Sequence, residues 1–380
     1  MGNIIKFIIA FLFFTRIFQL VGLNIPNSIL TAVLGYFVIS ELSQKSEFSF
    51  LIRSFVCFIF FSCISSYVYR GQYNIFTTFT QSFIYLSLAF YFVCSWLKMN
   101  SEEVERSLVI IGLISVGAYF LQNAVYPTVI FADAQNDYVT EVRIRMCGSI
   151  IYSFLFFYGI NKYVIKRRAI CLLYAALAFV CVMIMGFRSL TVSLLALGIL
   201  EYGYLSGFSM KRLKQFIPLL VIIAIVSQLD IVGDKFSEMM ARQERGDNFD
   251  NADYVRFAEF DYYWNNYFTN NIERFFGSGL PVNGTALHRL QTYNFSFNLF
   301  WNDWGLLGLS WIYGIPAICI LYFMYLKVIF SKLPKDYLYL KVLCVFLVLT
   351  SLTSAEAFRP GNLLLQGAFF YLVMHVKKKR

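Results

Sequence analysis

The sequence predicts an all-α, polytopic integral membrane protein with about twelve transmembrane helices and one large extracytoplasmic loop. Three observations predict this fold class. Hydrophobic residues make up 59% of the 380 residues and charged residues only 14%, whereas a soluble chain is nearer a quarter charged. The apolar residues form runs of roughly 20, the length that crosses a bilayer. Lys and Arg cluster beside these runs, as they do in cytoplasmic loops.

The individual spans follow from the apolar runs between polar breaks. They lie near 4–22, 26–42, 50–69, 75–97, 106–125, 146–163, 169–187, 189–207, 215–232, 300–326, 338–354 and 361–376. We expect the first run to be a membrane helix rather than a cleaved signal peptide, because no small-residue cleavage site follows it. The chain then divides into spans 1–9 (1–232), an outer loop (233–299) and spans 10–12 (300–380), all within one membrane domain.

The basic residues predict the orientation. Clusters occur at Lys162–Arg168, Lys211–Lys214, Lys327–Lys341 and Lys377–Arg380, and twelve crossings place all of them on the cytoplasmic face together with both termini. The loop 233–299 then lies outside, and it carries nine acidic residues against six basic ones. Although the net charge is +10, its placement beside apolar runs argues against nucleic-acid binding.

Arg188 lies at the predicted outer edge of the membrane, between two apolar runs, in the segment Gly186–Thr191. A guanidinium group cannot lose its charge by deprotonation, so it needs a partner there. Two interpretations remain open. Arg188 is either an interfacial arginine that reaches toward water, or a fixed cation that faces a phosphate or pyrophosphate group.

The outer loop contains a predicted amphipathic helix at Ala252–Phe276, because apolar and aromatic residues recur there at helical spacing. Arg256 and Glu259 are three residues apart on it, so they can pair with each other or act on a substrate. The density of Tyr, Trp and Asn is typical of a sugar-binding surface. Residues that we expect to bind sugar are Asp253, Asp261, Trp264 and Asn294. The glycine after the helix, Gly277, predicts its C-terminal end.

Two further polar groups fall on the predicted outer face. Glu356 and Arg359 precede the last span; they either pair with each other or close the rim of a substrate site. His288 lies in the loop and is either a solvated side chain or a participant in proton transfer. No HExxH, DxD, Walker or CxxC pattern occurs in the sequence. We therefore expect neither a metal nor a cofactor.

The order of these features resembles a known family. Apolar spans lead to a Gly-x-Arg-Ser junction (Gly186–Ser189) and then to an outer loop with the arginine-headed segment Arg256–Gly279, which ends in Gly-x-Gly. About 25 residues later, Gly-Leu-Leu-Gly-Leu (Gly305–Leu309) enters the next span. This layout is similar to that of the O-antigen and capsular polysaccharide repeat-unit polymerases (Wzy-type) and the related O-antigen ligases.

The resemblance implies a bacterial cytoplasmic-membrane glycosyltransferase that works on the outer face with lipid-linked donors. Such a polymerase transfers a growing glycan from undecaprenyl pyrophosphate to the terminal sugar of a new lipid-linked repeat, and its pathway includes a flippase and a chain-length regulator. Arg188 and Arg256 match the arginines that handle the lipid pyrophosphates. Groups available to accept the acceptor proton are Asp253, Glu259, Asp261 and His288.

Two alternative functions remain open at this stage. Ligases of the same family tend to carry a His-Asn pair about eleven residues before the Gly-Leu-Leu-Gly motif. Asn294 and Phe295 occupy that position here, and His288 lies six residues earlier, which favours a polymerase. A non-enzymatic flippase or transporter is expected to have charged residues within its spans. Here the charges concentrate in one loop.

Overall fold

The computed structural model describes ten segments of the chain. They are residues 2–15, 25–125, 128–131, 138–139, 144–145, 148–186, 188–207, 255–352, 354–359 and 361–378, with the backbone alone described at 138–139, 144–145, 188, 255, 356 and 378. This part of the chain is almost entirely helical, which confirms the all-α prediction. A two-residue antiparallel ladder pairs β1 (Tyr138–Val139) with β2 (Ile144–Arg145).

The helices follow the predicted apolar runs closely. Those before the outer loop are α1 (Gly2–Phe14), α2 (Asn27–Ser40), α3 (Glu47–Arg70), α4 (Ile75–Gln81), α5 (Phe83–Leu86), α6 (Phe90–Trp96), α7 (Ser101–Ala124), α8 (Ser149–Lys166), α9 (Ala169–Met185) and α10 (Arg188–Ser206). Those that follow are α14 (Val255–Asp261), α15 (Asn271–Phe276), α16 (Ala286–Ser296), α17 (Gly305–Tyr313), α18 (Ile315–Ile329), α19 (Leu338–Ser351) and α20 (Asn362–Lys378). Short 3₁₀ turns are η2 (Ser87–Ala89), η5 (Trp301–Trp304), η6 (Lys335–Tyr337) and η7 (Ala355–Phe358).

Local signals explain where several helices begin and end. Ser46 and Asn100 form capping boxes at the starts of α3 and α7, so their side chains satisfy backbone N–H groups that the helix leaves unpaired. Gly71 and Gly186 end α3 and α9 in the left-handed region, where a side chain would be strained.

The described helices include a few that are long and apolar enough to cross a membrane. Within the described ranges, α3, α7 and residues 189–206 of α10 meet that description, and the bent pair of α4 with residues 83–96 makes a fourth. The predicted total of twelve crossings remains a prediction. The predicted span 215–232 lies outside the described residues, as does the start of the outer loop to residue 254.

Three segments that were predicted as single helices are divided. The run 75–97 bends by 60° after Gln81. The run 300–326 divides at Gly314, which has φ +84° and lies against the backbone of Phe275. The predicted loop helix 252–276 is divided in the same way: α14 ends at Asp261, and a π-helical turn follows at Tyr262–Asn266. A new helix, α15, starts after Asn270. Asn270 divides the segment because its extended backbone and side-chain bond to the Glu273 N–H, at 2.9 Å, start a fresh helix.

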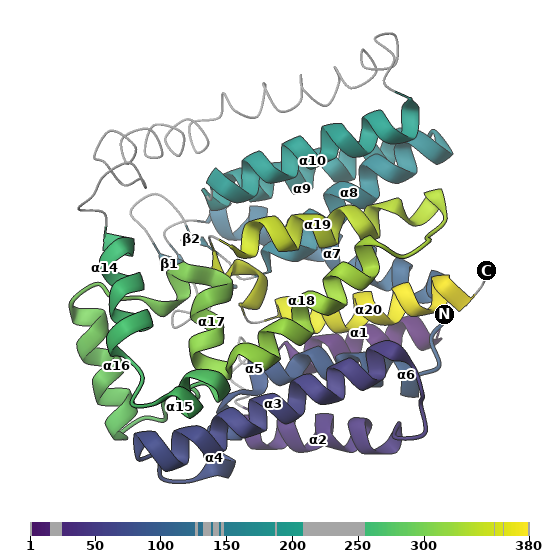
Figure 1. The fold of residues 1–380 in the computed structure, drawn as a ribbon. Coiled ribbons are helices and arrows are strands. Elements are labelled where there is room, and N and C mark those ends of the chain that lie inside the picture. The colour runs from purple at the N-terminus through teal and green to yellow at the C-terminus, as the bar shows by residue number, and fades with distance from the viewer. Residues whose placement is uncertain are drawn as a thin grey trace.

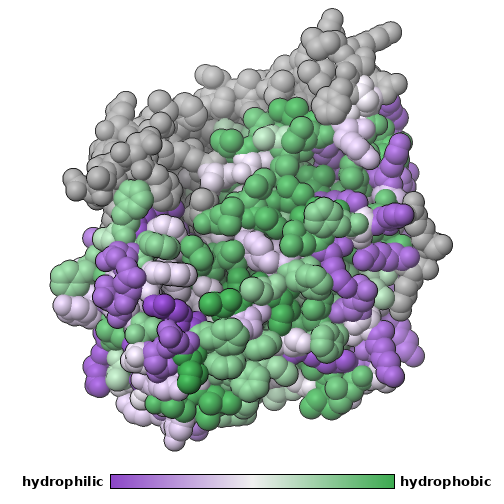
Figure 2. Space-filling model, in the orientation of Figure 1, coloured by the Kyte–Doolittle hydropathy of each residue, from purple (hydrophilic) through white to green (hydrophobic). Residues whose placement is uncertain are grey.

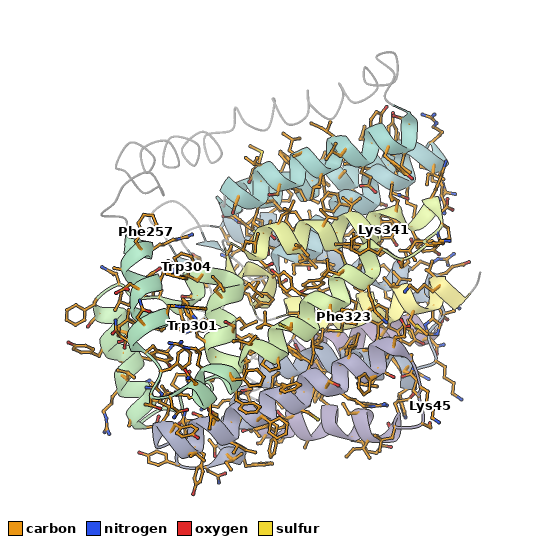
Figure 3. All side chains as sticks on the ribbon, in the orientation of Figure 1. Lys45, Phe257, Trp301, Trp304, Phe323 and Lys341 are labelled. Carbon is orange, nitrogen blue, oxygen red and sulfur yellow. The ribbon has the colours of Figure 1, made fainter. Side chains whose placement is uncertain are left out.

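The long helices lie side by side, and the loop helices gather at one end of them (Figure 1). α14, α15 and α16 occupy that end, whereas α1 begins and α20 ends at the opposite end, beside the turns after α8 and α18. Lys45 and Lys341 lie at the second end, Phe257, Trp301 and Trp304 at the first (Figure 3). Hydrophobic residues cover the middle of the visible face, and hydrophilic residues gather toward both ends (Figure 2).

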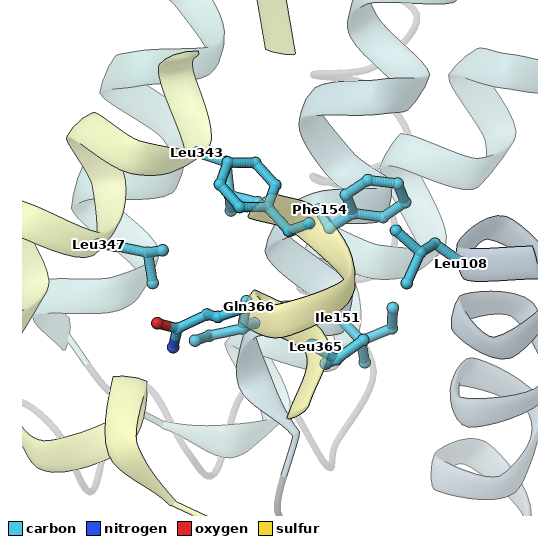
Figure 4. A pocket seen from close by; sticks show the side chains of 9 residues that line it. Leu108, Ile151, Phe154, Leu343, Leu347, Leu365 and Gln366 are labelled. Carbon is cyan, nitrogen blue, oxygen red and sulfur yellow. The ribbon is translucent and has the colours of Figure 1, made fainter. Parts of the chain in front are cut away.

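The interior of the bundle leaves little space. A cavity of about 10 Å³ lies between α7, α8, α19 and α20, among Leu108, Ile151, Phe154, Leu343 and Gln366 (Figure 4). This volume is about that of one water molecule, and the Gln366 amide already bonds Tyr325 and the Ala357 carbonyl. We therefore interpret the cavity as a packing defect and look for function at the end that carries the loop helices.

Candidate functional site

α14 and the π-helical turn that follows it are held against η5 and α17 by contacts between aromatic rings. The Tyr263 ring lies 4.7 Å from that of Trp311, nearly parallel to it, and its hydroxyl donates to the Leu299 carbonyl at 3.0 Å. Phe260, one turn earlier, contacts Trp304 with ring centroids 5.1 Å apart. The inward face of α14 is therefore aromatic, and the polar residues of α14 lie beside this contact. Phe257 points away from it and is 43% exposed.

Glu259 lies on the inward face of α14 and is fully buried. Its Oε1 accepts the Phe300 N–H at 3.0 Å, so the residue before η5 fixes the carboxyl group. Burial raises the pKa of Glu259 to about 7. The Asp303 carboxylate adds to the rise, whereas the Phe300 N–H, the Arg256 guanidinium and the Trp304 side chain oppose it. The carboxyl group is therefore close to half-ionised at neutral pH.

Asp303 is the second carboxylate of the site, and it remains partly exposed. Partial burial raises its pKa, and the positive charges of Arg256 and Arg359 oppose that rise. Arg256 comes from α14, whereas Arg359 comes from the connection between η7 and α20. Arg256, Glu259 and Arg359 therefore lie within electrostatic reach of Asp303, and the four charged groups come from three segments. We call Arg256, Glu259, Asp303 and Arg359 the carboxyl–arginine cluster.

Glycines of the Gly-Leu-Leu-Gly motif make this convergence possible. A Cβ on Gly305 would lie 2.2 Å from the Ser351 carbonyl oxygen, and one on Gly308 would lie 1.7 Å from that of Trp301. No side chain fits at either position, because the contacting atoms are backbone. Gly305 also has φ +49°. The motif therefore brings η5 against the end of α19, from which the segment with Arg359 continues.

The Gly-x-Gly segment that follows α15 joins the loop to α17. The N–H groups of Ser278 and Gly279 donate to the carbonyls of Trp311 and Ile312 at 2.9 and 2.8 Å. A Cβ on Gly277 would lie 2.3 Å from the Ile312 oxygen. Gly277 also ends α15 as predicted, with φ +87°. Both glycine motifs of the sequence thus act by allowing close backbone contact.

The structure places the other predicted site residues away from the carboxyl–arginine cluster or leaves them undescribed. Asp261 is exposed, and its carboxylate accepts a hydrogen bond from Asn265 at 2.6 Å. Trp264 is 41% exposed, with the Arg274 guanidinium 5.6 Å from its ring. Asn294 is 2% exposed and lies beside Tyr263. Asp253 and the side chains of Arg188 and Glu356 lie outside the described part of the chain.

His288 lies in the first turn of α16. Its N–H donates to the Thr285 hydroxyl at 3.2 Å, and its carbonyl accepts from the Thr292 hydroxyl at 2.9 Å. Among the described residues, no contact joins its imidazole to the carboxyl–arginine cluster. No group of three or more His, Cys, Asp or Glu side chains within those residues is arranged to hold a metal ion.

Sequence reasoning assigned no role to Asp303 or Trp304, although both precede Gly305 directly. Their position before the Gly-Leu-Leu-Gly motif could have indicated a role, because a residue just before a motif that forces close backbone contact has a fixed place in the fold. Comparison with known proteins adds no relative, because no protein-family model, no curated protein and no solved structure matches the chain.

Proposed function

We propose that the chain is a bacterial cytoplasmic-membrane glycosyltransferase that polymerises lipid-pyrophosphate-linked oligosaccharide repeats into O-antigen or capsular polysaccharide. One observation carries the proposal. Arg256 and Arg359, from segments about 100 residues apart, lie within electrostatic reach of Asp303, which in turn acts on the buried Glu259, at the end of the bundle that holds the loop helices. Two cations and two carboxyl groups at a membrane edge match the needs of this reaction.

The chemistry requires both kinds of group. The leaving group is a lipid pyrophosphate, which gains negative charge as the glycosidic bond breaks, and guanidinium groups stabilise that charge by paired hydrogen bonds. The acceptor is a sugar hydroxyl, which becomes a better nucleophile when a carboxylate takes its proton. The substrates are undecaprenyl-pyrophosphate oligosaccharides in the bilayer, and the partners are the flippase and the chain-length regulator of the same pathway.

The experiment is the polysaccharide profile of a deletion strain that expresses each variant at equal membrane level. Arg188→Ala and Arg256→Ala are expected to abolish long-chain polysaccharide and to leave single repeats on the surface. The control is Arg289→Ala, which removes an exposed arginine from α16 of the same loop and is expected to keep normal chain lengths. Normal ladders in Arg256→Ala would disprove the carboxyl–arginine cluster as the site, and normal ladders in both variants would disprove the proposed roles of the two arginines.

The same strain separates the alternative functions. Loss of a polymerase gives one repeat per acceptor, loss of a ligase gives free lipid-linked polymer, and loss of a flippase traps repeats in the cytoplasm. Arg188→Lys then tests the role of the guanidinium. Lysine provides a point charge without the planar fork, so we expect a strong loss of polymer. Full activity of Arg188→Lys would mean that charge without the fork is sufficient.

A further inference from the structure

The two carboxyl groups of the carboxyl–arginine cluster differ in access. Glu259 is 0% exposed, and its Oε1 is engaged by the Phe300 N–H at 3.0 Å. Asp303 lies three residues after Phe300, and part of its surface is exposed. Of the two residues, Asp303 is therefore the more accessible to a sugar hydroxyl.

The position of Asp303 is fixed from both sides. On one side, Trp304 packs on Phe260 of α14 with ring centroids 5.1 Å apart. On the other, Gly305 allows η5 to lie against the backbone of Ser351 and Ser354, at the end of α19. The backbone of η5 at Asp303 is thereby held in place, within electrostatic reach of Arg256 and Arg359. A group that is held in this way loses little freedom when it meets a substrate.

We propose that Asp303 accepts the proton of the acceptor hydroxyl, and that Glu259 positions the turn that carries Asp303 through its bond to the Phe300 N–H. This inference rests on the proposed glycosyl transfer. The hydroxyl proton moves to the Asp303 carboxylate as the hydroxyl oxygen forms a bond to the anomeric carbon of the donor. The bond from that carbon to the pyrophosphate oxygen breaks, and its electron pair leaves on the lipid pyrophosphate. Arg256 and Arg359 face the charge that leaves.

The two arginines have a second effect on this step. Burial raises the pKa of Asp303, and the charges of the two arginines oppose that rise, so they favour the ionised carboxylate that can take a proton. Glu259 has the opposite effect, because its own negative charge raises the proton affinity of Asp303. Within the described part of the chain, the cations that act on Asp303 are Arg256 on α14 and Arg359 after η7, and Arg256 also acts on Glu259. Ionisation of Glu259 is thus expected to strengthen Asp303 as a base.

The other carboxylate and imidazole groups of the loop are placed less well for this role. Asp261 is exposed and is bonded to Asn265 on its own helix. His288 makes its hydrogen bonds within α16 through its main chain, among the described residues. Among the described residues, electrostatic interaction with both Arg256 and Arg359 is recorded for Asp303, which favours Asp303 for coupling proton transfer to departure of the pyrophosphate.

The test uses purified full-length protein and lipid-linked repeats, with the elongation rate measured against pH. Asp303→Asn is expected to lower kcat by about 100-fold or more with little change in KM. Asp303→Glu, which keeps the carboxylate but moves it by one methylene, is expected to recover part of that loss. Glu259→Gln is expected to remain active, but its plot of elongation rate against pH should lack the inflection near neutral pH that titration of Glu259 gives the wild type. The matched control is Asp336→Asn, an exposed aspartate in the 3₁₀ turn η6, whose rate should equal that of the wild type.

Two results would overturn the inference. One is an Asp303→Asn variant that keeps more than about a tenth of the wild-type kcat, because loss of the general base should lower kcat by about 100-fold or more. The other is an inactive Glu259→Gln beside an active Asp303→Asn, which would make Glu259 the base. Failure of the proposed function looks different. In that case the wild-type protein itself does not elongate the repeats, and the deletion strain keeps its polymer.

Discussion

Arg70 and Glu273 form a buried ion pair although they are 203 residues apart in the chain. The Arg70 side chain is 8% exposed and that of Glu273 is fully buried. Arg70 also donates to the Tyr267 carbonyl and lies over the Tyr267 ring, 4.5 Å from its centroid. Glu273 in turn accepts the N–H and hydroxyl of Thr269, both at 2.8 Å. This pair joins the end of α3 to the start of α15 and so fixes the loop helices on the bundle.

Removal of one partner should therefore be costly. Arg70→Gln leaves the Glu273 carboxylate buried without its cation, and we expect the free energy of unfolding to fall by about 3–5 kcal/mol. Thermal unfolding of the purified protein in detergent measures the change. The control is Glu47→Gln, because Glu47 also forms an ion pair, with Lys327 Nζ 2.7 Å from its Oε2, but its side chain is 61% exposed. That change should cost less than about 1 kcal/mol. Equal losses in the two variants would contradict the prediction.

Gly308→Ala should disrupt the site without removing any charged group. Its Cβ would lie 1.7 Å from the Trp301 carbonyl oxygen, so α17 and η5 must separate and Asp303 must move. We expect loss of both thermal stability and long-chain polymer. Gly117→Ala is the matched control, since a Cβ there meets no atom within 4 Å inside helix α7. Alanine at that position should be neutral or stabilise the helix by up to about 1 kcal/mol. A harmless Gly308→Ala would show that the close contact is not needed.

The stability of the protein should depend on pH through Glu259. Its folded-state pKa is about 7, against an ordinary value of 4.5, so the folded protein holds this proton where the unfolded chain has lost it. Stability from this group is therefore greatest at acidic pH and is lost as pH rises from about 4.5 through about 7. Glu259→Gln removes this dependence, because the amide stays neutral. Between pH 5 and 8, the melting temperature of Glu259→Gln should rise relative to that of the wild type as the pH increases. Parallel curves would contradict the pKa shift.

A second buried pair, at the opposite end of the bundle, allows a test by double substitution. Lys162 on α8 lies 2.7 Å from Glu105 on α7, and Tyr339 donates to the same carboxylate at 2.7 Å. Lys162→Met leaves Glu105 as an uncompensated buried charge and should destabilise the protein by about 3–5 kcal/mol. Adding Glu105→Gln should recover much of that loss, since no buried charge then remains. The same thermal assay measures both variants, and a double variant that is no more stable than Lys162→Met would contradict the argument.

The positions of the helices could be predicted well from the sequence. α3, α7, α8, α9, α19 and α20 each begin and end within a few residues of a predicted span. The reason is local, because a long apolar run satisfies its own backbone polar groups only as a helix. The breaks in the predicted helices 75–97, 252–276 and 300–326 were missed. Asn270 and Gly314 cause two of these breaks, through a side-chain cap and a close approach to the Phe275 backbone.

The candidate site could be predicted only in part. Arg256, Glu259 and Arg359 stood out because charged residues are rare in this chain, and the structure brings these three together. The sequence left open whether Arg256 and Glu259 simply pair along one helix. In the structure, the Glu259 carboxylate accepts the Phe300 N–H and lies within electrostatic reach of both Arg256 and Asp303. Asp303 was missed because its neighbours are distant in the chain.

The sequence by itself determined that the chain is helical, that its apolar runs lie where helices form, and that its unusual polar residues concentrate after residue 232 and before the last helix. These features depend on hydropathy and charge, which act over a few turns of chain. The tertiary structure decided which of those polar residues meet. That choice depends on backbone contacts through Gly305 and Gly308 and on the buried Arg70–Glu273 pair, which join segments far apart in sequence. Asp303 becomes part of the carboxyl–arginine cluster through contacts of this kind.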